Sequence, residues 1–200
     1  MTDEPIRILF VCHANLCRSP MAERLTRHTL AERFGRAGDG VEVASAGTHA
    51  WSNLPMHPLA AEVLAEYGVE DLQFSSRRLT SSMVARADLI LTATRAQRSA
   101  CVAFDPVAVR RTFTIPQFGR YAAGLSTVSL MGLRTPRDRL ATMIEELSVV
   151  RAGVPVPAPE DDELADPVRS PVQVFRRCAG AIQTVVDSMT GLILPMQLTP

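Results

Sequence analysis

The feature that most constrains this chain is a cysteine and an arginine with five residues between them, directly after an apolar run. Cys12 and Arg18 frame that segment, residues 8–11 precede it, and Ser19-Pro20 and an amphipathic stretch follow. This order predicts a buried strand, a tight loop and a helix. The N–H groups of such a short loop can turn inward as an anion nest, and the helix adds the positive end of its dipole. The segment therefore predicts a cradle for a phosphate or a similar tetrahedral anion.

The two ends of this cradle carry complementary chemistry. Helix N-termini and nearby cations lower the pKa of a cysteine thiol, so we expect a nucleophilic thiolate at Cys12. The planar guanidinium of Arg18 holds two phosphate oxygens at once, which a lysine cannot do. Ser19 has two compatible interpretations. Its hydroxyl donates a hydrogen bond to the Cys12 sulfur, or it is the N-cap of the helix, with Pro20 in the first turn.

Phosphate chemistry of this kind also needs a proton donor. A leaving alkoxide or phenolate must be protonated, and an aspartate on a mobile loop is a suitable general acid. Asp166, followed by Pro167, fits this role by its position near the C-terminus. The other carboxylates, at residues 160–163, are typical of a solvated acidic loop before a helix.

The residues around Cys12 resemble the signature of the low-molecular-weight protein tyrosine phosphatase family. The stretch VCHANLCRSPMAE at residues 11–23 carries the resemblance, which continues with SAGT at 45–48, ADLILT at 87–92 and Asp166-Pro167. It covers roughly residues 5–118 and 160–190. The resemblance implies a phosphatase that hydrolyses phosphotyrosine on proteins through a cysteinyl-phosphate on Cys12. It further implies Arg18 as the residue that stabilises the transition state, Asp166 as the general acid, and no cofactor.

The resemblance also implies roles for the rest of the loop and its surroundings. It assigns phosphate or substrate contacts to His13, Ala14, Asn15, Leu16, Cys17, Arg18, Ser19 and Trp51. Asn15 is expected to bond within the loop and to Ser45, against the alternative of a plain turn residue. His13 either lies at the pocket rim as a hydrogen-bonding group or is merely exposed. Cys17 is either a redox partner of the nucleophile or a small buried residue.

Three positions need separate interpretation. Ala14 stands where the family usually has glycine, so the backbone there must suit an alanine. Val168 stands where an aromatic residue usually lines the substrate slot. Trp51 lies six residues after Ser45, where the family often has an aromatic wall. We interpret Trp51 as that wall, because its neighbours are polar; the alternative is a tryptophan packed in the core.

The order of apolar segments predicts a single α/β domain with a central parallel sheet of about four strands flanked by helices. Expected strands are 6–11, 41–45, 89–92 and 113–115; expected helices are 21–34, 58–67, 137–151 and 171–190, with a glycine-rich turn at 35–40. The active-site loop then follows the first strand at its carboxyl end. One domain spans 1–200, with an inserted helix and a Pro-rich connector at about 122–159. The insertion is expected to pad the surface, form a local lid or bind a partner.

Charge and composition exclude several classes of protein. Lysine plus arginine and aspartate plus glutamate number 21 each, so no global field attracts nucleic acid or an anionic membrane. The sequence has no long apolar run for a signal or a membrane span. Four unevenly placed cysteines and histidines without ligand spacing indicate a cytoplasmic protein with no metal site.

Three alternative functions remain open from the sequence. Protein arginine phosphatases share this loop, but they look to carry a threonine at the position of Leu16. An arsenate reductase of this fold needs two further cysteines after the third strand, where only Cys101 occurs. A non-catalytic phosphate-binding or scaffold protein would keep the cradle without turnover. The expected partner is a tyrosine-phosphorylated protein, with a tyrosine kinase as one candidate, and the sequence does not indicate the oligomeric state.

Overall fold

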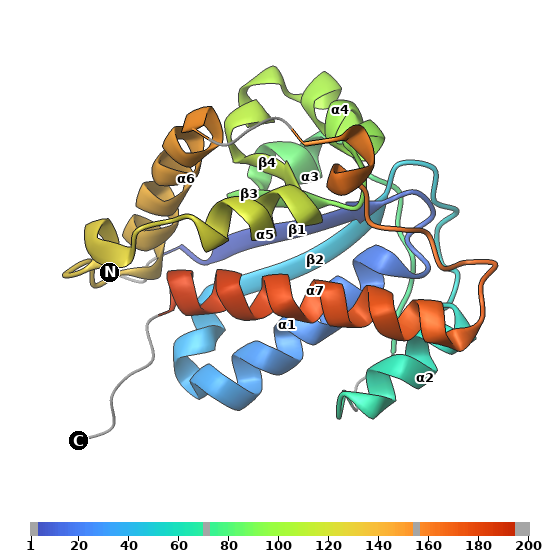
Figure 1. Cartoon of the computed structure of the whole chain (residues 1–200). Helices are drawn as coiled ribbons and strands as arrows, with labels where there is room; N and C mark the ends of the chain where they lie inside the picture. The colour runs from blue at the N-terminus through green and yellow to red at the C-terminus, as the bar shows by residue number, and fades with distance from the viewer. Residues whose placement is uncertain (1–3, 70–72, 154–156, 195–200) are drawn as a thin grey trace.

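The computed structural model describes residues 4–69, 73–153 and 157–194. Within these residues, four parallel strands form one sheet in the order β2-β1-β3-β4 (Figure 1). The strands are β1 (Ile6–Cys12), β2 (Val41–Gly47), β3 (Leu89–Thr92) and β4 (Thr112–Thr114). β1 lies in the middle, with Ile8 paired to Val43 on one side and to Leu89 on the other. The predicted parallel sheet of about four strands is confirmed.

Helices cover both faces of this sheet, which explains why residues 8–12 of β1 form a continuous apolar run. Ile8 and Phe10 contribute to the larger hydrophobic cluster, while Leu9 and Val11 contribute to the smaller one on the opposite face. The larger cluster includes residues of α1 (Arg18–Phe34), α2 (Pro58–Glu66), α5 (Ile115–Ala123), α6 (Pro136–Gly153) and α7 (Val172–Ile193). The smaller cluster includes residues of α3 (Ser81–Arg86), α4 (Arg95–Phe104) and the 3-10 helix η2 (Pro106–Arg111).

The four predicted helices are present, with shifted ends. α1 begins at Arg18 rather than at residue 21, because the loop after β1 closes directly into the helix. The predicted turn at 35–40 is a 3-10 helix, η1 (Gly35–Gly40). The fourth strand ends at Thr114 rather than at residue 115, because Thr114 and Gln117 form a capping box that starts α5.

No bounds were predicted from the sequence for three short helices. α3, α4 and α5 span 6, 10 and 9 residues. Each has a threonine N-cap whose side chain accepts a backbone N–H, at Thr80, Thr94 and Thr114. Helices this short owe most of their stability to packing, so the sequence pattern alone is a weak guide to them.

The helix predicted at 137–151 is present as α6, which packs against α5 and α7. Arg139 donates to the backbone oxygens of Leu130, 2.7 Å away, and Leu192, 2.8 Å away. Arg137 donates to Asp88, just before β3. These contacts lie toward the amino ends of the strands, opposite the carboxyl ends where Cys12 lies. Of the predicted Pro-rich connector, residues 154–156 lie outside the described residues.

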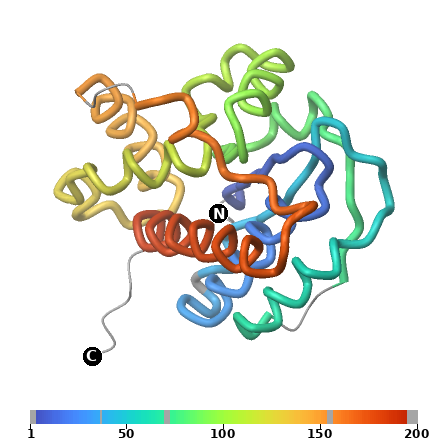
Figure 2. The backbone as a smooth tube through the Cα atoms, turned by 45° about the vertical axis from the view of Figure 1, so that its right-hand side comes forward, coloured from blue at the N-terminus to red at the C-terminus, as the bar shows by residue number. Residues whose placement is uncertain are grey.

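The chain returns to the carboxyl end of the sheet after α6. The short 3-10 helix η4 (Pro159–Asp162) and the segment that follows it run past the loop after β1 before α7 begins (Figure 2). α7 is the longest described helix, at 22 residues, and its apolar side packs on the larger cluster. None of the described helices combines the length and the apolar character needed to cross a membrane.

Candidate active site

Cys12 is the last residue of β1 and its side chain is buried. Its sulfur accepts two hydrogen bonds from the following loop and helix. The Asn15 backbone N–H lies 3.3 Å from the sulfur, and the Ser19 hydroxyl lies 3.0 Å from it. Donors aimed at one atom stabilise negative charge there, which is what a nucleophilic thiolate requires.

The structure decides between the two interpretations of Ser19. The N-cap of α1 is Cys17, with no side-chain cap bond, so the interpretation of Ser19 as N-cap is wrong. Ser19 lies inside the first turn instead. Its hydroxyl reaches back to the Cys12 sulfur and lies 3.3 Å from the Ala46 carbonyl oxygen. The Ser19 hydroxyl therefore donates a hydrogen bond to the Cys12 sulfur and does not cap the helix.

Asn15 holds the shape of the loop from within. It is fully buried and has a φ of 55°, a left-handed conformation that asparagine tolerates better than most residues. Its amide nitrogen donates to the hydroxyls of Ser45 and Ser19, each 2.9 Å away. Its amide oxygen accepts the Arg77 backbone N–H at 2.9 Å. The left-handed residue of the loop is thus Asn15, and Ala14 is not among the described residues with positive φ.

A buried carboxylate that the sequence did not point to completes this network. The Ser45 hydroxyl donates to Glu23 Oε2 at 2.6 Å, and the Glu23 side chain is only 1% exposed. Arg27 Nη2 lies 3.0 Å from Glu23, and Arg77 Nη2 lies 3.9 Å from it. Glu23 stands within the family signature, but its inward orientation depends on how α1 packs against β2. The chain of contacts joins α1, β2 and the loop into one rigid unit.

Gly47 allows the segment after β2 to lie against the loop. Thr48 donates its backbone N–H to the Cys12 oxygen at 3.0 Å, and His49 donates to the His13 oxygen at 2.9 Å. A Cβ added at Gly47 would lie 2.6 Å from the His13 oxygen and 2.8 Å from the Asn15 nitrogen. Backbone atoms on both sides leave no room for a side chain.

We therefore expect Gly47→Ala to destabilise the protein by roughly 1–3 kcal/mol, the usual cost of overpacking. Inorganic phosphate binding should weaken as well, because the loop must shift to admit the methyl group. Urea unfolding and calorimetry measure both effects. Gly191→Ala is the matched control, because nothing lies within 4 Å of an added Cβ on that exposed helical residue. Equal stability of the two variants would contradict the prediction.

Asp166 meets Arg18 across 148 residues of sequence. Arg18 is buried, its Nη2 lies 2.6 Å from Asp166 Oδ2, and its Nη1 donates to the Leu164 oxygen at 3.0 Å. Leu164 also donates its backbone N–H to the Ala93 oxygen at 2.8 Å, which attaches this segment to the end of β3. The structure thus brings Cys12, Arg18 and Asp166 to the same edge of the sheet, as predicted from the loop and the acid.

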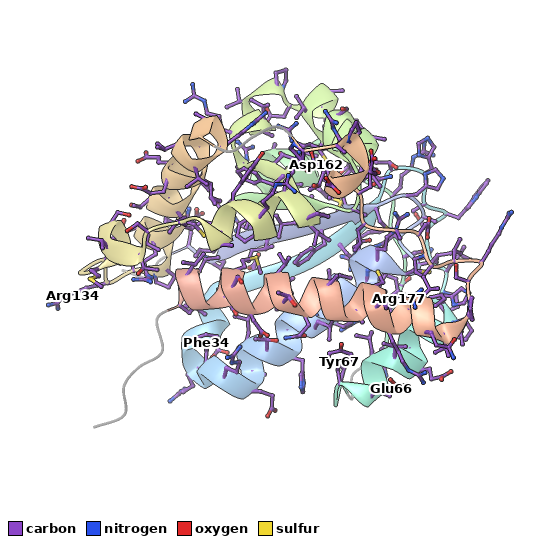
Figure 3. The ribbon with its side chains drawn as sticks, in the orientation of Figure 1. Phe34, Glu66, Tyr67, Arg134, Asp162 and Arg177 are labelled. Carbon is purple, nitrogen blue, oxygen red and sulfur yellow. The ribbon has the colours of Figure 1, made fainter. Side chains whose placement is uncertain are left out.

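The segment that carries Asp166 is anchored by Asp162, a residue that the sequence analysis placed in a solvated acidic loop. That interpretation is wrong for Asp162, which is buried. Asp162, labelled in Figure 3, accepts a hydrogen bond from Gln117 Nε2 at 2.7 Å and forms an ion pair with Arg120. Both partners lie on α5. The predicted loop is therefore tied to the helix that follows β4.

We expect Asp162→Ala to lower kcat by about tenfold and stability by roughly 2–3 kcal/mol, because it leaves the buried Gln117 and the partly buried Arg120 without their partner. The loss of kcat follows from looser placement of the Asp166 carboxyl. Steady-state kinetics and urea unfolding test this, with the exposed neighbour substitution Asp161→Ala as the control. Indistinguishable kcat values for the two variants would rule out the anchoring role.

Trp51 and the histidines lie around the mouth of the loop. Trp51 is 81% exposed, so the alternative of a core tryptophan is wrong. It belongs to the segment that runs beside the loop, tied there by His49 at one end and by a His57 N–H donated to the Leu16 oxygen at the other. His13 is exposed and stacks on His49, with ring centroids 4.5 Å apart. These three side chains are exposed, on the loop and on the segment that hydrogen-bonds to it.

Cys17 is buried behind the loop. Burial, followed by the nearby Cys12, raises the pKa of the Cys17 thiol to about 12, so it stays protonated at neutral pH. This favours the interpretation of Cys17 as a small buried residue over that of a redox partner of Cys12. Cys101 is buried in the smaller cluster, on the opposite face of the sheet from Cys12.

Comparison with known proteins shows to which family a chain with this site belongs. The profile of the low molecular weight phosphotyrosine protein phosphatases matches residues 7–146. The chain belongs to that family. This low molecular weight phosphatase is 34% identical over 148 residues to the probable low molecular weight protein-tyrosine-phosphatase EpsP of Ralstonia nicotianae, covering 74% of this chain and 90% of the relative. It is therefore a hydrolase of the phosphatase class.

The same phosphatase is similar to proteins named for a different substrate. It is 35% identical over 148 residues to a protein-arginine-phosphatase of Geobacillus stearothermophilus, covering 72% of this chain and 95% of that relative. A solved structure of the YwlE arginine phosphatase from Geobacillus stearothermophilus aligns with a TM-score of 0.64 at 28% identity, over 92% of this chain and 90% of the other. Family membership therefore establishes a protein phosphatase, while the relatives are named for two different phosphorylated residues.

Proposed function

We propose that this phosphatase hydrolyses phosphotyrosine on proteins through a cysteinyl-phosphate on Cys12. The observation that carries the proposal is the state of Arg18 between the loop and Asp166. Its Nε is buried and finds no hydrogen-bond partner among the residues that the structure describes. A buried donor without an acceptor costs about 1–3 kcal/mol. A phosphate oxygen held in the loop is the acceptor that would remove this cost.

In the first step, the Cys12 thiolate attacks phosphorus on the side opposite the tyrosyl oxygen. The sulfur–phosphorus bond forms as the phosphorus–oxygen bond breaks, and Asp166 gives its proton to the departing phenolate. Arg18 and the loop N–H groups stabilise the three remaining phosphoryl oxygens while charge spreads over them. Arg18 exchanges its contact with Asp166 for the phosphate, which leaves that carboxyl facing the leaving group.

In the second step, water hydrolyses the cysteinyl-phosphate. The Asp166 carboxylate takes a proton from the water as its oxygen attacks phosphorus, and the sulfur departs as a thiolate. The Ser19 hydroxyl, 3.0 Å from the sulfur, supports the negative charge that returns to Cys12. Free phosphate then leaves, and the enzyme returns to its starting state with no cofactor consumed.

The choice of phosphotyrosine over phosphoarginine is supported by the residues around the cradle. Leu16 is apolar, whereas arginine phosphatases look to carry a threonine at this position. A leucine offers no polar contact to a leaving guanidinium nitrogen. Trp51 presents an exposed aromatic ring at the rim of the site, suited to a flat phenyl ring. Phosphoarginine is the second candidate substrate, favoured by the similarity to the protein-arginine-phosphatase of Geobacillus stearothermophilus.

Peptides that differ only in the phosphorylated residue test the proposal. We expect turnover of the phosphotyrosine peptide to exceed that of the phosphoarginine peptide by about 10–100-fold in kcat/KM, the range that single pocket contacts supply. Leu16→Thr should shift this ratio toward phosphoarginine, and Cys12→Ser should abolish both activities. A preference of the unmodified enzyme for phosphoarginine would overturn the assignment. Tight phosphate binding without turnover of either peptide would favour a scaffold.

The proposal also covers arsenate reduction, the partner protein and the cellular compartment. Arsenate reduction is disfavoured because Cys101 lies across the sheet from Cys12 and cannot relay a disulfide to it. We propose a tyrosine-phosphorylated protein as partner, with a tyrosine kinase as one candidate. We also propose action in the cytoplasm, where the four free cysteines would stay reduced.

A further inference from the structure

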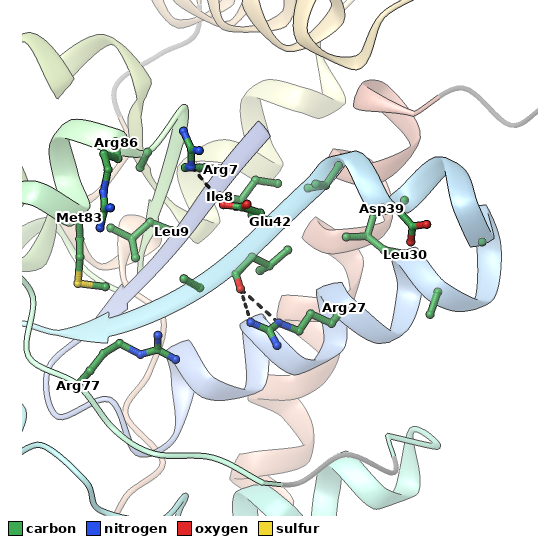
Figure 4. Close-up of a pocket in the computed structure, with 17 residues that line it drawn as sticks. Arg7, Ile8, Leu9, Arg27, Leu30, Asp39, Glu42, Arg77, Met83 and Arg86 are labelled. Atoms are coloured by element: carbon green, nitrogen blue, oxygen red, sulfur yellow. Dashed lines mark hydrogen bonds and ion pairs between the residues drawn. The ribbon is translucent and has the colours of Figure 1, made fainter. Parts of the chain in front are cut away.

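A groove with a volume of about 740 Å³ follows the outer edge of β2, between α1 and α3 (Figure 4). The loop after β1 contributes no residue to its lining. We propose that this groove binds an extended acidic segment of a partner protein, which adds a strand to the free edge of β2. The inference does not depend on which phosphorylated residue the enzyme hydrolyses.

The backbone of β2 offers a template for strand addition. Within the described residues, β2 is the end strand of the sheet, and only its last residue pairs outward with another backbone segment. Gly47 donates its N–H to the Arg77 oxygen at 3.0 Å and accepts the Leu79 N–H at 2.9 Å. Because alternate residues of a strand direct their polar groups to the same side, Val43 and Ser45 also face outward. Free edges of this kind pair readily with extended peptides.

Among the described residues, no strand continues the line of residues 77–79 along the rest of β2. The outward Val43 oxygen is instead capped by Arg27, whose Nη2 lies 2.6 Å away and whose Nε lies 3.2 Å away (Figure 4). The Arg27 side chain is half exposed, so an incoming strand would displace a flexible side chain rather than a packed element. The released guanidinium would then face the new strand.

Both walls of the groove combine apolar surface with arginine. On the α3 side, Met83 and the exposed Arg86 line the groove to the left of Arg7 of β1 (Figure 4). On the α1 side, Leu30 lies beside Arg27. Side chains of an extended segment point alternately to the two walls, so glutamates and apolar residues on either side would find a complementary contact.

The charge of the lining selects an acidic occupant. Four arginines, at positions 7, 27, 77 and 86, line the groove against two carboxylates, Asp39 and Glu42, in a chain with no net charge. Arg86 donates to the Ser82 backbone oxygen and forms no ion pair within the described part of the chain. The Arg7–Glu42 pair, at 3.1 Å, is half exposed, and exposed pairs exchange partners at little cost.

Arg86 is the residue on which to test the proposal. Arg27 and Arg77 also hold the buried Glu23 of the loop network, so their substitution would disturb the active site. Arg86→Glu reverses one charge of the groove without touching that network. Arg110→Glu, on the exposed side of η2, reverses a charge outside the groove and serves as the matched control.

The probe is a fluorescein-labelled eight-residue peptide of glutamate and valine, followed by anisotropy in saturating inorganic phosphate so that the catalytic loop is occupied. We expect binding that Arg86→Glu weakens about tenfold and Arg110→Glu leaves unchanged. N-methylation of alternate peptide amides should abolish binding to the unmodified protein, because it removes the strand hydrogen bonds. This last arm needs no protein variant.

Three outcomes would overturn the proposal. One is displacement of the peptide by phosphate, which would place it in the catalytic loop. The second is equal binding of a peptide with lysine in place of glutamate. The third is an unchanged affinity after N-methylation or after Arg86→Glu. None of these results bears on turnover, so a failure here is distinguishable from a failure of the proposed phosphatase substrate.

Discussion

Cys12→Ser is expected to lower turnover of a phosphotyrosine peptide by about 10⁴-fold or more while leaving the phosphate site intact. A serine hydroxyl in the same place is a far weaker nucleophile than a thiolate, and loss of a nucleophile costs several orders of magnitude in kcat. The loop N–H groups and Arg18 are unchanged in this variant. Inorganic phosphate should therefore still bind, which calorimetry measures beside the kinetics.

The control for this variant is Cys101→Ala. Cys101 is buried in the smaller cluster on the opposite face of the sheet, so this substitution should cost some stability and leave kcat unaltered. Residual activity of Cys12→Ser above about 1% of the unmodified enzyme would contradict the nucleophilic role, since far larger losses are expected. Loss of phosphate binding together with activity would indicate instead that the loop itself had collapsed.

Asp166→Asn is expected to reduce kcat for phosphotyrosine peptides by about 10²–10⁴-fold, the contribution of a positioned general acid. The loss should be much smaller for p-nitrophenyl phosphate, because its leaving group is stable without a proton. Comparing the two substrates isolates proton donation from other effects of the substitution. The measurement is steady-state kinetics on both substrates with one enzyme preparation.

A control variant and the shape of the asparagine side chain make this comparison specific for proton donation. Asp161→Asn changes an exposed carboxyl five residues away and should leave both rates near those of the unmodified enzyme. The Asp166→Asn substitution keeps a side chain of the same shape beside Arg18, so the ion pair is weakened without a cavity. Equal losses for the two substrates would show that Asp166 positions Arg18 rather than donating a proton.

Much of this protein could be predicted from local order along the chain. The apolar run of β1, the loop and α1 lie within a few dozen consecutive residues, and so do Cys12, Asn15, Arg18 and Ser19. Their contacts follow from the short distance in sequence. The alternation of apolar strands and amphipathic helices likewise predicted the parallel sheet, because such a sheet must be covered on both faces.

Other features depend on which segments meet in space. The burial of Glu23 and Asp162, the exposure of Trp51 and the partner of the Ser19 hydroxyl all required the folded structure to settle them. For the two buried carboxylates, the neighbour comes from another element: Ser45 of β2 for Glu23, and Gln117 of α5 for Asp162. A sequence pattern shows the periodicity of apolar and polar residues, but it does not show which element packs against them.

The sequence by itself determined the loop that we interpret as a phosphate cradle, with Cys12 and Arg18 at its ends, because five residues between a buried strand and a helix have few ways to fold. Only the tertiary structure decided how that cradle is held and what lies beyond it. The contact of Arg18 with Asp166 closes 148 residues of chain, and the open edge of β2 exists because no other strand pairs with it among the described residues. Contacts between segments that lie far apart in the sequence depend on how whole helices and strands pack. In that packing, the free energy of burial outweighs local conformational preferences.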